Sequence, residues 1–398
     1  MIFPFRGFRY SEKAGKLEDL IAPPYDVIGK DYRKQLINRS PYNIVHLTLP
    51  ESFDSEYHDE VKEKLNDWCN KKILVQDESE RYYVVVQKFS IEGKTFERYG
   101  FIGLFDLQQS GRIIRHEITF DRYIDDRVKL LKATKSNLEP IFLVFEDREN
   151  TLEKVAELTS CQRLDFEDYS IKFSAVAPEN LSGLVEKIKK GNLFIADGHH
   201  RFQASLEFFK KTKDAPQYIM VYLTNLFSPG LVVLPTHRAI KVKLEQRHLE
   251  KVKQFFSVEE KDNLKQAIEF IKSTNNISFG VYFDSHFQTW TLTEEERIMT
   301  FMPGHYSRQW KSLDVAVLHH FIIEKVFGIP ADEKLYYDRD PYKIVEYVNH
   351  NPGSIGFFMQ TPDLMKIRQI AMNGEILPPK TTFFYPKVPS GLVIARYV

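Results

Sequence analysis

The stretch from residue 192 to 206 constrains the fold more than any other part of the chain. Its apolar run Leu193–Ala196 has the length and flanks of a buried β-strand. Asp197 and Gly198 follow as a sharp turn, and the pattern from His199 onward is typical of a helix. Four apolar side chains are spaced for the buried side of that helix: Phe202, Ala204, Leu206 and Phe209. The stretch therefore predicts a strand, a tight turn and a helix start.

This junction is suited to hold an anion. The N–H groups of a first helical turn have no partners within the helix, and Gly198 lets the backbone approach a phosphate closely. Arg201, one turn in, can add a bidentate contact to a phosphate or carboxylate. Asp197 is an acceptor at the strand end, and His199 and His200 can move protons near neutral pH. The alternative is a helix-capping aspartate with two surface histidines, but so many polar residues behind one buried strand favour a functional site.

Composition limits the classes of partner. With 398 residues and 43% hydrophobic residues, the chain can form two or three domains with real cores. Lys and Arg together number 55, as do Asp and Glu, so the chain has no excess positive charge to attract a polyanion. We therefore expect no nucleic-acid partner. From about Glu245 the sequence shifts to charged helical patterns. We therefore expect a core domain over residues 1–240 and a C-terminal α/β subdomain over 241–398 that contributes a closing basic loop.

The cysteines and the apolar runs indicate a cytoplasmic protein. Cys69 and Cys161 are far apart in the sequence and form no CxxC motif, which favours a reducing compartment. The first residues lack the apolar run of a signal peptide, and no apolar run approaches the length of about 18 residues that a membrane span needs. We expect no membrane partner.

Periodicity predicts a mixed α/β fold, that is, α+β with a mixed β-sheet. Residues 81–107 form a hairpin pattern with its turn at Glu92-Gly93-Lys94, and Ile141–Phe145 follows as a buried strand. Alternation over Tyr42–Leu49 predicts a strand that contains His46, and Arg297–Met302 predicts a short β run. Asp121–Ala133 is typical of a charged helix.

Two proline-stiffened loops carry further candidate residues. The segment Ala22–Ile28 contains two prolines, which restrict the backbone and can hold Asp26 in a fixed position. The segment from Gly374 to Gly391 carries Lys380 and Lys387, and a stiff basic loop can hold an anion at low entropic cost. A rigid surface loop and a solvated tail are the plain alternatives.

Several large enzyme classes lose their usual sequence support. The chain has no Walker A motif, GxGxxG fingerprint, GxSxG elbow or kinase catalytic loop, and His116-Glu117 is not part of an HExxH zinc motif. If the remaining polar loops converge, cations can clamp phosphates while a carboxylate takes a proton from an acceptor hydroxyl. Asp and Glu side chains can also hold Mg²⁺ together with the phosphates.

Five ordered motifs resemble one family along essentially the whole chain. The motifs are Ala22-Pro-Pro-Tyr-Asp-Val-Ile28, Pro41-Tyr-Asn-Ile-Val45, Ile195-Ala-Asp-Gly-His-His-Arg201, Leu234-Pro-Thr-His-Arg238 and Pro378-Pro-Lys-Thr-Thr-Phe-Phe-Tyr-Pro-Lys387. By these motifs the chain is identified as a member of the bacterial and archaeal family called domain of unknown function 1015. The family name implies no reaction.

The turn also resembles the phosphate-binding turn of the ParB and sulfiredoxin superfamily. That superfamily includes CTP-binding partition proteins, ATP-dependent sulfiredoxins and ADP-dependent free-serine kinases. The resemblance implies that Gly198, His199, His200 and Arg201 contact nucleotide phosphates. The turn lacks the sulfiredoxin cysteine, and the chain lacks the charge excess expected for DNA partition. The kinase branch meets neither objection, and the expected core is a sheet with a ParB/sulfiredoxin-like strand-turn-helix.

These observations lead to one leading hypothesis and two alternatives. The first is a nucleotide-dependent phosphotransferase that uses ATP or ADP with Mg²⁺ and acts on a small hydroxyl-bearing metabolite. Its expected catalytic residues are Asp26, Glu117, His199 and His200, with Asp26 or Glu117 as the base. Its expected nucleotide-binding residues are Asp197, Gly198, Arg201, His237, Arg238, Lys380 and Lys387. The second hypothesis is a nucleotide-gated switch without fast chemistry, and the third is metal-dependent hydrolysis by His116, His199 and His200.

Overall fold

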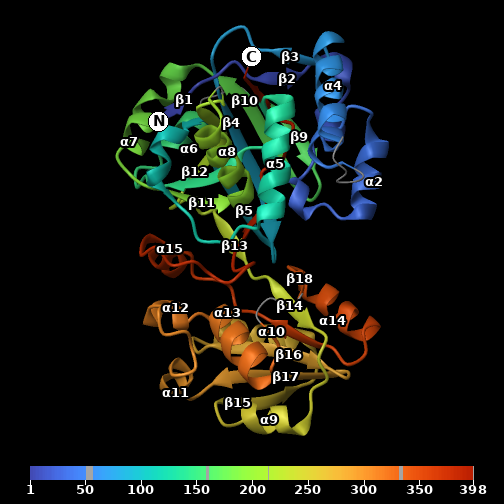
Figure 1. Cartoon of the computed structure of the whole chain (residues 1–398), viewed down its shortest axis with the longest axis vertical. Coiled ribbons are helices and arrows are strands. Elements are labelled where there is room, and N and C mark those ends of the chain that lie inside the picture. Colours follow the sequence, from blue (N-terminus) through green and yellow to red (C-terminus); the bar gives the residue numbers. More distant parts are fainter. Residues whose placement is uncertain (51–56, 158–160, 214, 331–334, 398) are drawn as a thin grey trace. The chain divides into compact units, whose positions relative to one another are not determined.

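The computed structural model describes residues 1–50, 57–157, 161–213, 215–330 and 335–397. The chain divides into two units, both visible in Figure 1. Unit 1 consists of Met1–Ile114, Thr119–Val232 and Pro386–Val398, and unit 2 of Arg115–Ile118 and Val233–Tyr385. The last segment of the chain therefore belongs to the same unit as the N-terminus.

A mixed β-sheet forms the centre of unit 1. Its strands lie in the order β6-β11-β8-β12-β5-β4-β10-β9, and β1 pairs with β5. Strand β11 pairs parallel with β6 and antiparallel with β8, while β12 pairs parallel with β8 and antiparallel with β5. The strands of unit 1 are β1 (Ile2–Phe3), β2 (Phe8–Tyr10), β3 (Leu74–Gln76), β4 (Tyr82–Ile91), β5 (Lys94–Asp106), β6 (Ile113–Ile114), β7 (Ser136–Asn137), β8 (Ile141–Phe145), β9 (Gln162–Phe166), β10 (Tyr169–Val176), β11 (Leu193–Asp197), β12 (Tyr218–Asn225) and β21 (Ala395–Arg396). The expected mixed sheet is confirmed.

Some helices of unit 1 cover a face of this sheet, and others, such as α2 and α4, pack at its side (Figure 1). The helices are α1 (Leu17–Leu20), a 3₁₀ turn (Tyr25–Val27), α2 (Lys30–Arg39), α3 (Val45–Thr48), α4 (Tyr57–Asn70), α5 (Asp121–Thr134), α6 (Thr151–Glu157), α7 (Ser182–Ile188) and α8 (His199–Lys211), with further 3₁₀ turns at Glu12–Ala14, Leu107–Arg112 and Pro178–Leu181. Figure 1 shows α5 and α8 side by side in front of the sheet, and their apolar contact consists of Ile124, Leu131, Ala204 and Phe208. Phe202 and Leu206 of α8 join the sheet core.

Strong local signals gave correct predictions in unit 1. The hairpin turn has φ 49° at Glu92 and 78° at Gly93, as a tight hairpin connection of two positive-φ residues requires. Strand β8, helix α5, strand β11 and helix α8 lie where the pattern indicated. The start of α8 follows Gly198, whose φ of 91° is left-handed and favours glycine.

The predicted strand Tyr42–Leu49 is wrong, because Val45–Thr48 is the short helix α3. The side chain of Asn43 explains this result. Its Oδ1 accepts the N–H of Val45 at 3.0 Å, while its Nδ2 donates to the carbonyl of Asp19 at 2.7 Å. Such a side-chain bond to the backbone two residues on starts a turn that outweighs the β-branched pattern.

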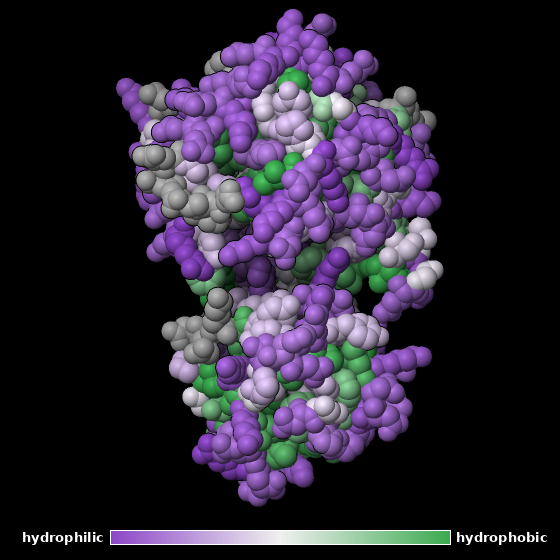
Figure 2. Space-filling model, turned by 90° about the vertical axis from the view of Figure 1, so that its right-hand side faces the viewer, coloured by the Kyte–Doolittle hydropathy of each residue, from purple (hydrophilic) through white to green (hydrophobic). Residues whose placement is uncertain are grey.

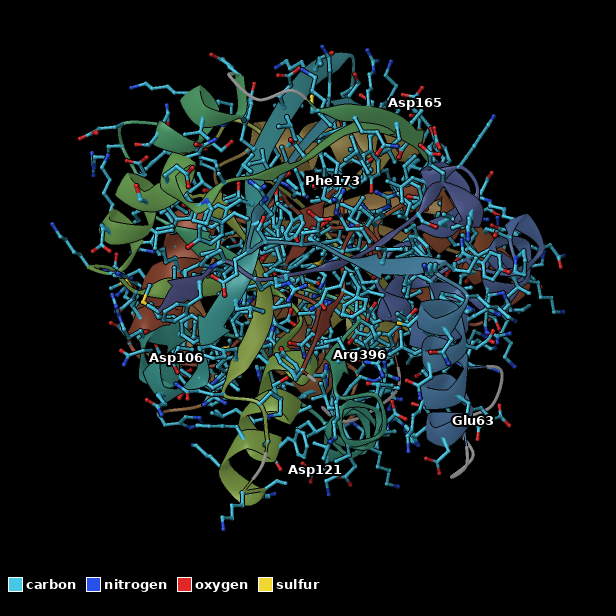
Figure 3. All side chains as sticks on the ribbon, turned by 90° about the horizontal axis from the view of Figure 1, so that it is seen from above. Glu63, Asp106, Asp121, Asp165, Phe173 and Arg396 are labelled. Carbon is cyan, nitrogen blue, oxygen red and sulfur yellow. The ribbon has the colours of Figure 1, made fainter. Side chains whose placement is uncertain are left out.

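The C-terminal segment completes unit 1. β21 pairs with β7, the backbone of Ile394 bridges Phe8, and Ser390 bridges Ala22. Arg396, labelled near the centre of the view in Figure 3, lies within 3.3 Å of the Cys69 sulfur. These contacts bring Lys387 and Ser390 to the N-terminal part of the chain.

Unit 2 contains an antiparallel sheet with the strand order β15-β17-β16-β19-β14-β18. Its strands are β13 (Val232–Leu234), β14 (His237–Ile240), β15 (Phe256–Lys261), β16 (Ser278–Phe283), β17 (His286–Leu292), β18 (Tyr336–Asp338), β19 (Ile355–Phe358) and β20 (Phe383–Tyr385). Its helices are α9 (Gln246–Val252), α10 (Leu264–Ser273), α11 (Glu295–Met299), α12 (Arg308–Lys311), α13 (Asp314–Val317), a π-helix (Leu318–Val326), α14 (Pro341–His350) and α15 (Leu364–Met372). The predicted β run Arg297–Met302 is wrong, because α11 occupies its first part and Ile298 is buried as part of that helix.

The surface of unit 1 is mostly polar on the face that Figure 2 presents, with apolar side chains scattered among hydrophilic ones. Scattered apolar residues are ordinary on a protein surface and indicate no large docking patch on this face. Among the described residues, no helix has both the length and the apolar character needed to cross a bilayer.

Candidate active site

The candidate site begins where β11 passes into α8. Strand β11 is buried up to Ala196, and its pairing with β8 shifts register between Ile195 and Asp197, which leaves Asp197 at the end of the ladder. Gly198 then turns the chain, and its carbonyl accepts the first helical hydrogen bond, from Phe202 at 2.9 Å. A Cβ atom at Gly198 would lie 3.0 Å from the guanidinium of Arg201, which is tighter than most Cβ contacts, so a larger residue would displace that side chain.

Asp197 joins two cations that are far apart in the sequence. Its Oδ2 accepts a hydrogen bond from Arg201 Nη2 at 2.7 Å, and its Oδ1 accepts one from Lys387 Nζ. The side chains of Asp197 and Lys387 are each 11% exposed, and that of Arg201 is 9% exposed. Arg201 Nη1 also donates to the carbonyl of Pro140 at 2.7 Å. Two positive charges are thus held together beside the first turn of α8.

Glu139 is the buried carboxylate behind this cluster. Its Oε1 accepts the N–H of Tyr25 at 3.0 Å and the hydroxyl of Ser390 at 2.9 Å. Burial raises the pKa of Glu139 above its ordinary value, although Arg201 and Arg127 oppose that shift. Glu139 therefore ties the loop that carries Asp26 to the C-terminal segment that carries Lys387.

Asp26 lies on the exposed side of the same cluster. It is exposed, within the 3₁₀ turn Tyr25–Val27, and the ring of Tyr25 lies 4.3 Å from the guanidinium carbon of Arg127. Burial alone would lower the pKa of Arg201, but the carboxylates of Glu139, Asp197 and Asp26 together raise it. The charge of Asp26 thus acts on Arg201, and the guanidinium stays protonated.

A small cavity lies beneath the cluster. Its volume is about 40 Å³, and both polar and apolar side chains line it: Arg127, Ser136, Asn137, Glu139, Arg201 and Ser205 with Leu130, Leu131, Leu138, Ile141 and Ile219. That volume admits a water molecule but not a nucleotide. A nucleotide that contacts Arg201 would therefore not occupy this cavity.

The two histidines of the turn differ in environment. His199 is buried at 4% exposure, so it is not the surface residue of the simple capping alternative. His200 is partly exposed, and its Nε2 accepts the N–H of Phe120 at 3.1 Å. His200 can therefore face a ligand at the surface, whereas His199 belongs to the interior of the turn.

The other predicted site residues belong to unit 2. His116 is buried, with Nε2 3.1 Å from the Thr382 hydroxyl, and the backbone of Glu117 bridges Leu377. His237 accepts the N–H of Met359 through Nδ1 at 3.0 Å, and burial lowers its pKa to about 3. The histidine is therefore neutral at physiological pH.

Arg238 is a buried donor to the backbone of unit 2. It donates to the carbonyls of Thr236 and, at 3.0 Å, Lys380, and its Nε lies 3.2 Å from the Nε2 of His319. Lys380 itself has a φ of 57° in the turn that Arg238 holds. These contacts give Arg238 a structural task, the support of the turn that carries Lys380.

Unit 1 therefore brings together Asp26, Asp197, Gly198, Arg201 and Lys387, with His200 beside them. Sequence reasoning missed Glu139 and Arg127, which hold the loop of Asp26. The signal for Glu139 was a carboxylate directly before Pro140 and a buried strand, where an unpaired charge would be costly. Within the described ranges, no group of three or more His, Cys, Asp or Glu side chains can hold a metal ion.

Gly198→Ala is expected to destabilise the protein by about 1–2 kcal/mol, because an L side chain is strained at a left-handed φ, and to displace the Arg201 guanidinium as well. Urea unfolding and nucleotide binding measure the two effects. Gly15→Ala is the matched control, since Gly15 has a φ of 103° with nothing within 4 Å of its Cβ position. Equal losses of ligand affinity in both variants would contradict a specific role for Gly198.

A comparison with family models supports the family inferred from the motifs. A family model described as "Protein of unknown function (DUF1015)" matches residues 2–316. No curated protein matches the chain. The family model spans more than half of the chain and confirms the expected family.

Three solved structures resemble the chain at low identity. A free serine kinase in complex with AMP has a TM-score of 0.37 at 15% identity, over 70% of this chain and 85% of that one. A conserved hypothetical protein from Pyrococcus furiosus has a TM-score of 0.38 at 15% identity, over 73% and 94%. SbnI with a C-terminal truncation from Staphylococcus aureus has a TM-score of 0.39 at 10% identity, over 73% and 86%.

Proposed function

The chain belongs to the DUF1015 family, whose description names no function, and we propose from its own site that it is a nucleotide-dependent phosphotransferase acting on a small hydroxyl-bearing metabolite. The observation that carries this proposal is the pairing of Arg201 and Lys387 on one carboxylate, Asp197, at the start of α8. Phosphoryl transfer requires mainly positioned positive charge, because the protein has little covalent work to do.

Arg201 and Lys387 are assigned to the phosphates of ATP or ADP. Arg201 donates two of its five N–H groups to Asp197 and Pro140. Its remaining N–H groups are assigned to a phosphate. The amides of the first turn of α8 and the helix dipole add to the attraction. Asp197 keeps both cations in register before the ligand arrives, which lowers the entropic cost of binding.

Asp26 is assigned as the general base. It shares unit 1 with Arg201, acts on it electrostatically and is exposed to an incoming substrate. In the proposed step the acceptor hydroxyl oxygen bonds to the terminal phosphorus as the bond to the leaving nucleotide breaks. The hydroxyl proton passes to the Asp26 carboxylate. Glu117, His237, Arg238 and Lys380 belong to unit 2, and the proposal assigns them no step.

Mg²⁺ would accompany the nucleotide as a complex with its phosphates, because hard cations prefer oxygen ligands. No step of the proposed mechanism passes through a metal held by the protein.

The test is to incubate the purified chain with ATP or ADP, Mg²⁺ and a set of small hydroxyl-bearing metabolites. We expect a phosphorylated product that accumulates over many turnovers, detectable by ³¹P NMR and by chromatography. The Asp26→Asn variant is expected to bind the nucleotide with unchanged affinity but to lose at least about 100-fold in rate, as general base catalysis contributes 10²–10⁴. Full activity in that variant would refute Asp26 as the base.

A second candidate is a nucleotide-gated switch without fast chemistry. The observation that favours it is the ion pair between Lys387 and Asp197. A phosphate that bound Lys387 in place of Asp197 would also displace the C-terminal segment, which pairs with β7 through β21. A switch binds the nucleotide and forms no product. Tight binding with no product from any acceptor would therefore favour the switch over the phosphotransferase.

A further inference from the structure

Two large aromatic side chains are exposed at the start of α5. Phe120 is 49% and Tyr123 37% exposed, and the two rings lie 6.4 Å apart at an angle of 75°. Figure 3 labels Asp121, the residue that follows Phe120, near the edge of the molecule in that view. Two neighbouring exposed rings offer π-faces on which a planar ligand can stack.

The imidazole of His200 connects these rings to the candidate site. It stacks on Phe120 with centroids 6.0 Å apart and planes at 17°, and it meets the edge of Tyr123 at 5.2 Å. The hydrogen bond from the N–H of Phe120 makes Nε2 of His200 an acceptor, so the neutral ring carries its proton on Nδ1. His200 stands two residues after Gly198, in the first turn of α8.

Arg122 adds a cation at the same place. Its Nη2 lies 2.8 Å from the Tyr123 hydroxyl, and its guanidinium carbon is 4.6 Å from the centre of the Tyr123 ring. This contact holds one side of the ring. The start of α5 therefore offers π-faces and positive charge next to His200, in the first turn of α8.

We propose that Phe120, Tyr123 and His200 form a stacking platform for the base of the bound nucleotide. The inference rests on the proposed function and deepens it: the donor is a nucleotide recognised through its aromatic base, rather than a phosphate compound without one. Stacking on aromatic side chains suits every base, because each has a π-face. With phosphates at the start of α8, the base reaches the platform across the sugar.

Charge favours a nucleotide over a protein segment as the occupant. Arg122 lies against the ring of Tyr123, while Arg201 and Lys387 pair with Asp197 at the turn. A nucleotide carries its negative charge at one end and its π-face at the other. An apolar protein segment would complement the rings but not the cations. The same ligand thus accounts for both observations.

The test compares ADP with inorganic pyrophosphate, which has the phosphates but no base. We expect the wild-type chain to bind ADP more tightly than pyrophosphate in calorimetric titrations. Phe120→Ala and Tyr123→Ala are each expected to weaken ADP about tenfold and to leave pyrophosphate unchanged, consistent with the stacking energies measured for bases on aromatic residues. Phe120→Trp is expected to restore ADP affinity, because it restores the π-face.

Phe227→Ala is the matched control. Phe227 is 36% exposed and has Arg148 5.1 Å from its ring, so the pair resembles Tyr123 and Arg122. Phe227 lies at the other end of β8 from Arg201. The N–H of the preceding residue, Leu226, donates to the carbonyl of Phe145 at the C-terminal end of β8, whereas Arg201 contacts Pro140, which precedes the strand. The loss of the Phe227 ring is expected to change neither affinity.

The outcomes distinguish a failure of the stacking platform from a failure of the proposed phosphate site. Equal binding of ADP and pyrophosphate, or unchanged ADP affinity in both alanine variants, would overturn the platform while the phosphate site stands. Binding of neither compound to the wild-type chain would overturn the proposed function and the platform with it. Circular dichroism of each variant establishes that the fold is retained.

Discussion

Arg201→Lys is expected to weaken nucleotide binding by about 10- to 100-fold, while the chain stays folded. Arginine offers a planar fork that matches a phosphate bidentately, and lysine offers a single mobile charge, so an exchange at a bidentate site costs one or two good hydrogen bonds. Lysine keeps the positive charge that Asp197 and Glu139 require. Titration calorimetry of ADP or ATP with both proteins measures the change.

Arg201→Ala is expected to lose stability as well as affinity. Removing one partner of a buried ion pair costs about 3–5 kcal/mol, because a buried charge is left uncompensated. Here Asp197 would keep only Lys387, and Glu139 would lose a nearby cation. The lysine variant is therefore the cleaner test of binding, and urea unfolding of the alanine variant tests the structural part.

Arg9→Lys provides the matched control. Arg9 pairs with Asp77 through two nitrogens in unit 1, with its Nε 3.0 Å from a carboxylate oxygen. The substitution removes the same fork from a pair with no assigned role, and nucleotide affinity should not change. If Arg201→Lys binds nucleotides as tightly as wild type, Arg201 is not a phosphate ligand.

The local parts of the fold could be predicted from sequence, since their signals lie within a few residues. The hairpin turn at Glu92-Gly93 and the left-handed Gly198 are examples, because backbone geometry restricts which residues can occupy them. The strand predicted at Tyr42–Leu49 failed for a tertiary reason. Asn43 bonds to the carbonyls of Asp19 and Ile21, more than 20 residues away, and the periodicity of the segment contains no trace of those partners.

The same distinction applies to the candidate site. Asp197 and Arg201 are four residues apart, and their pairing follows from the spacing of a helix start. Lys387 comes from 190 residues away, so its arrival at Asp197 depends on the return of the C-terminal segment. Arg238, a predicted nucleotide-binding residue, donates to the backbone carbonyls of Thr236 and Lys380, and its spacing in the sequence indicates neither contact. A motif names a residue type, and only the fold decides what that residue contacts.

Glu139→Ala is expected to destabilise the protein by about 3 kcal/mol, because two buried donors lose their acceptor at roughly 1–3 kcal/mol each. The donors are the N–H of Tyr25 and the hydroxyl of Ser390. Glu139→Gln keeps an acceptor oxygen at the same place and is expected to lose much less. Urea unfolding of both variants at neutral pH measures the difference, and equal losses would contradict a role for Glu139 as the acceptor that holds the Asp26 loop.

The pH dependence of stability tests the charge of Glu139 separately. Burial is the main cause of its raised pKa, so the folded state binds this proton more tightly than the unfolded state. The contribution of Glu139 to the free energy of unfolding therefore falls as pH rises from its ordinary pKa of 4.5 through the higher folded value. Glutamine does not titrate, and the variant should lack this decline.

Glu97→Gln serves as the control of opposite sign. A hydrogen bond from Tyr99 lowers the pKa of Glu97, so Glu97 contributes stability that is present above 4.5 and lost as pH falls through its folded pKa. Its removal should therefore reduce the loss of stability in acid, whereas removal of Glu139 should reduce the loss toward neutral pH. Unfolding curves recorded between pH 3 and 8 distinguish the two variants. If the free energy of unfolding of Glu139→Gln varies with pH as in the wild type, burial does not raise the pKa of Glu139.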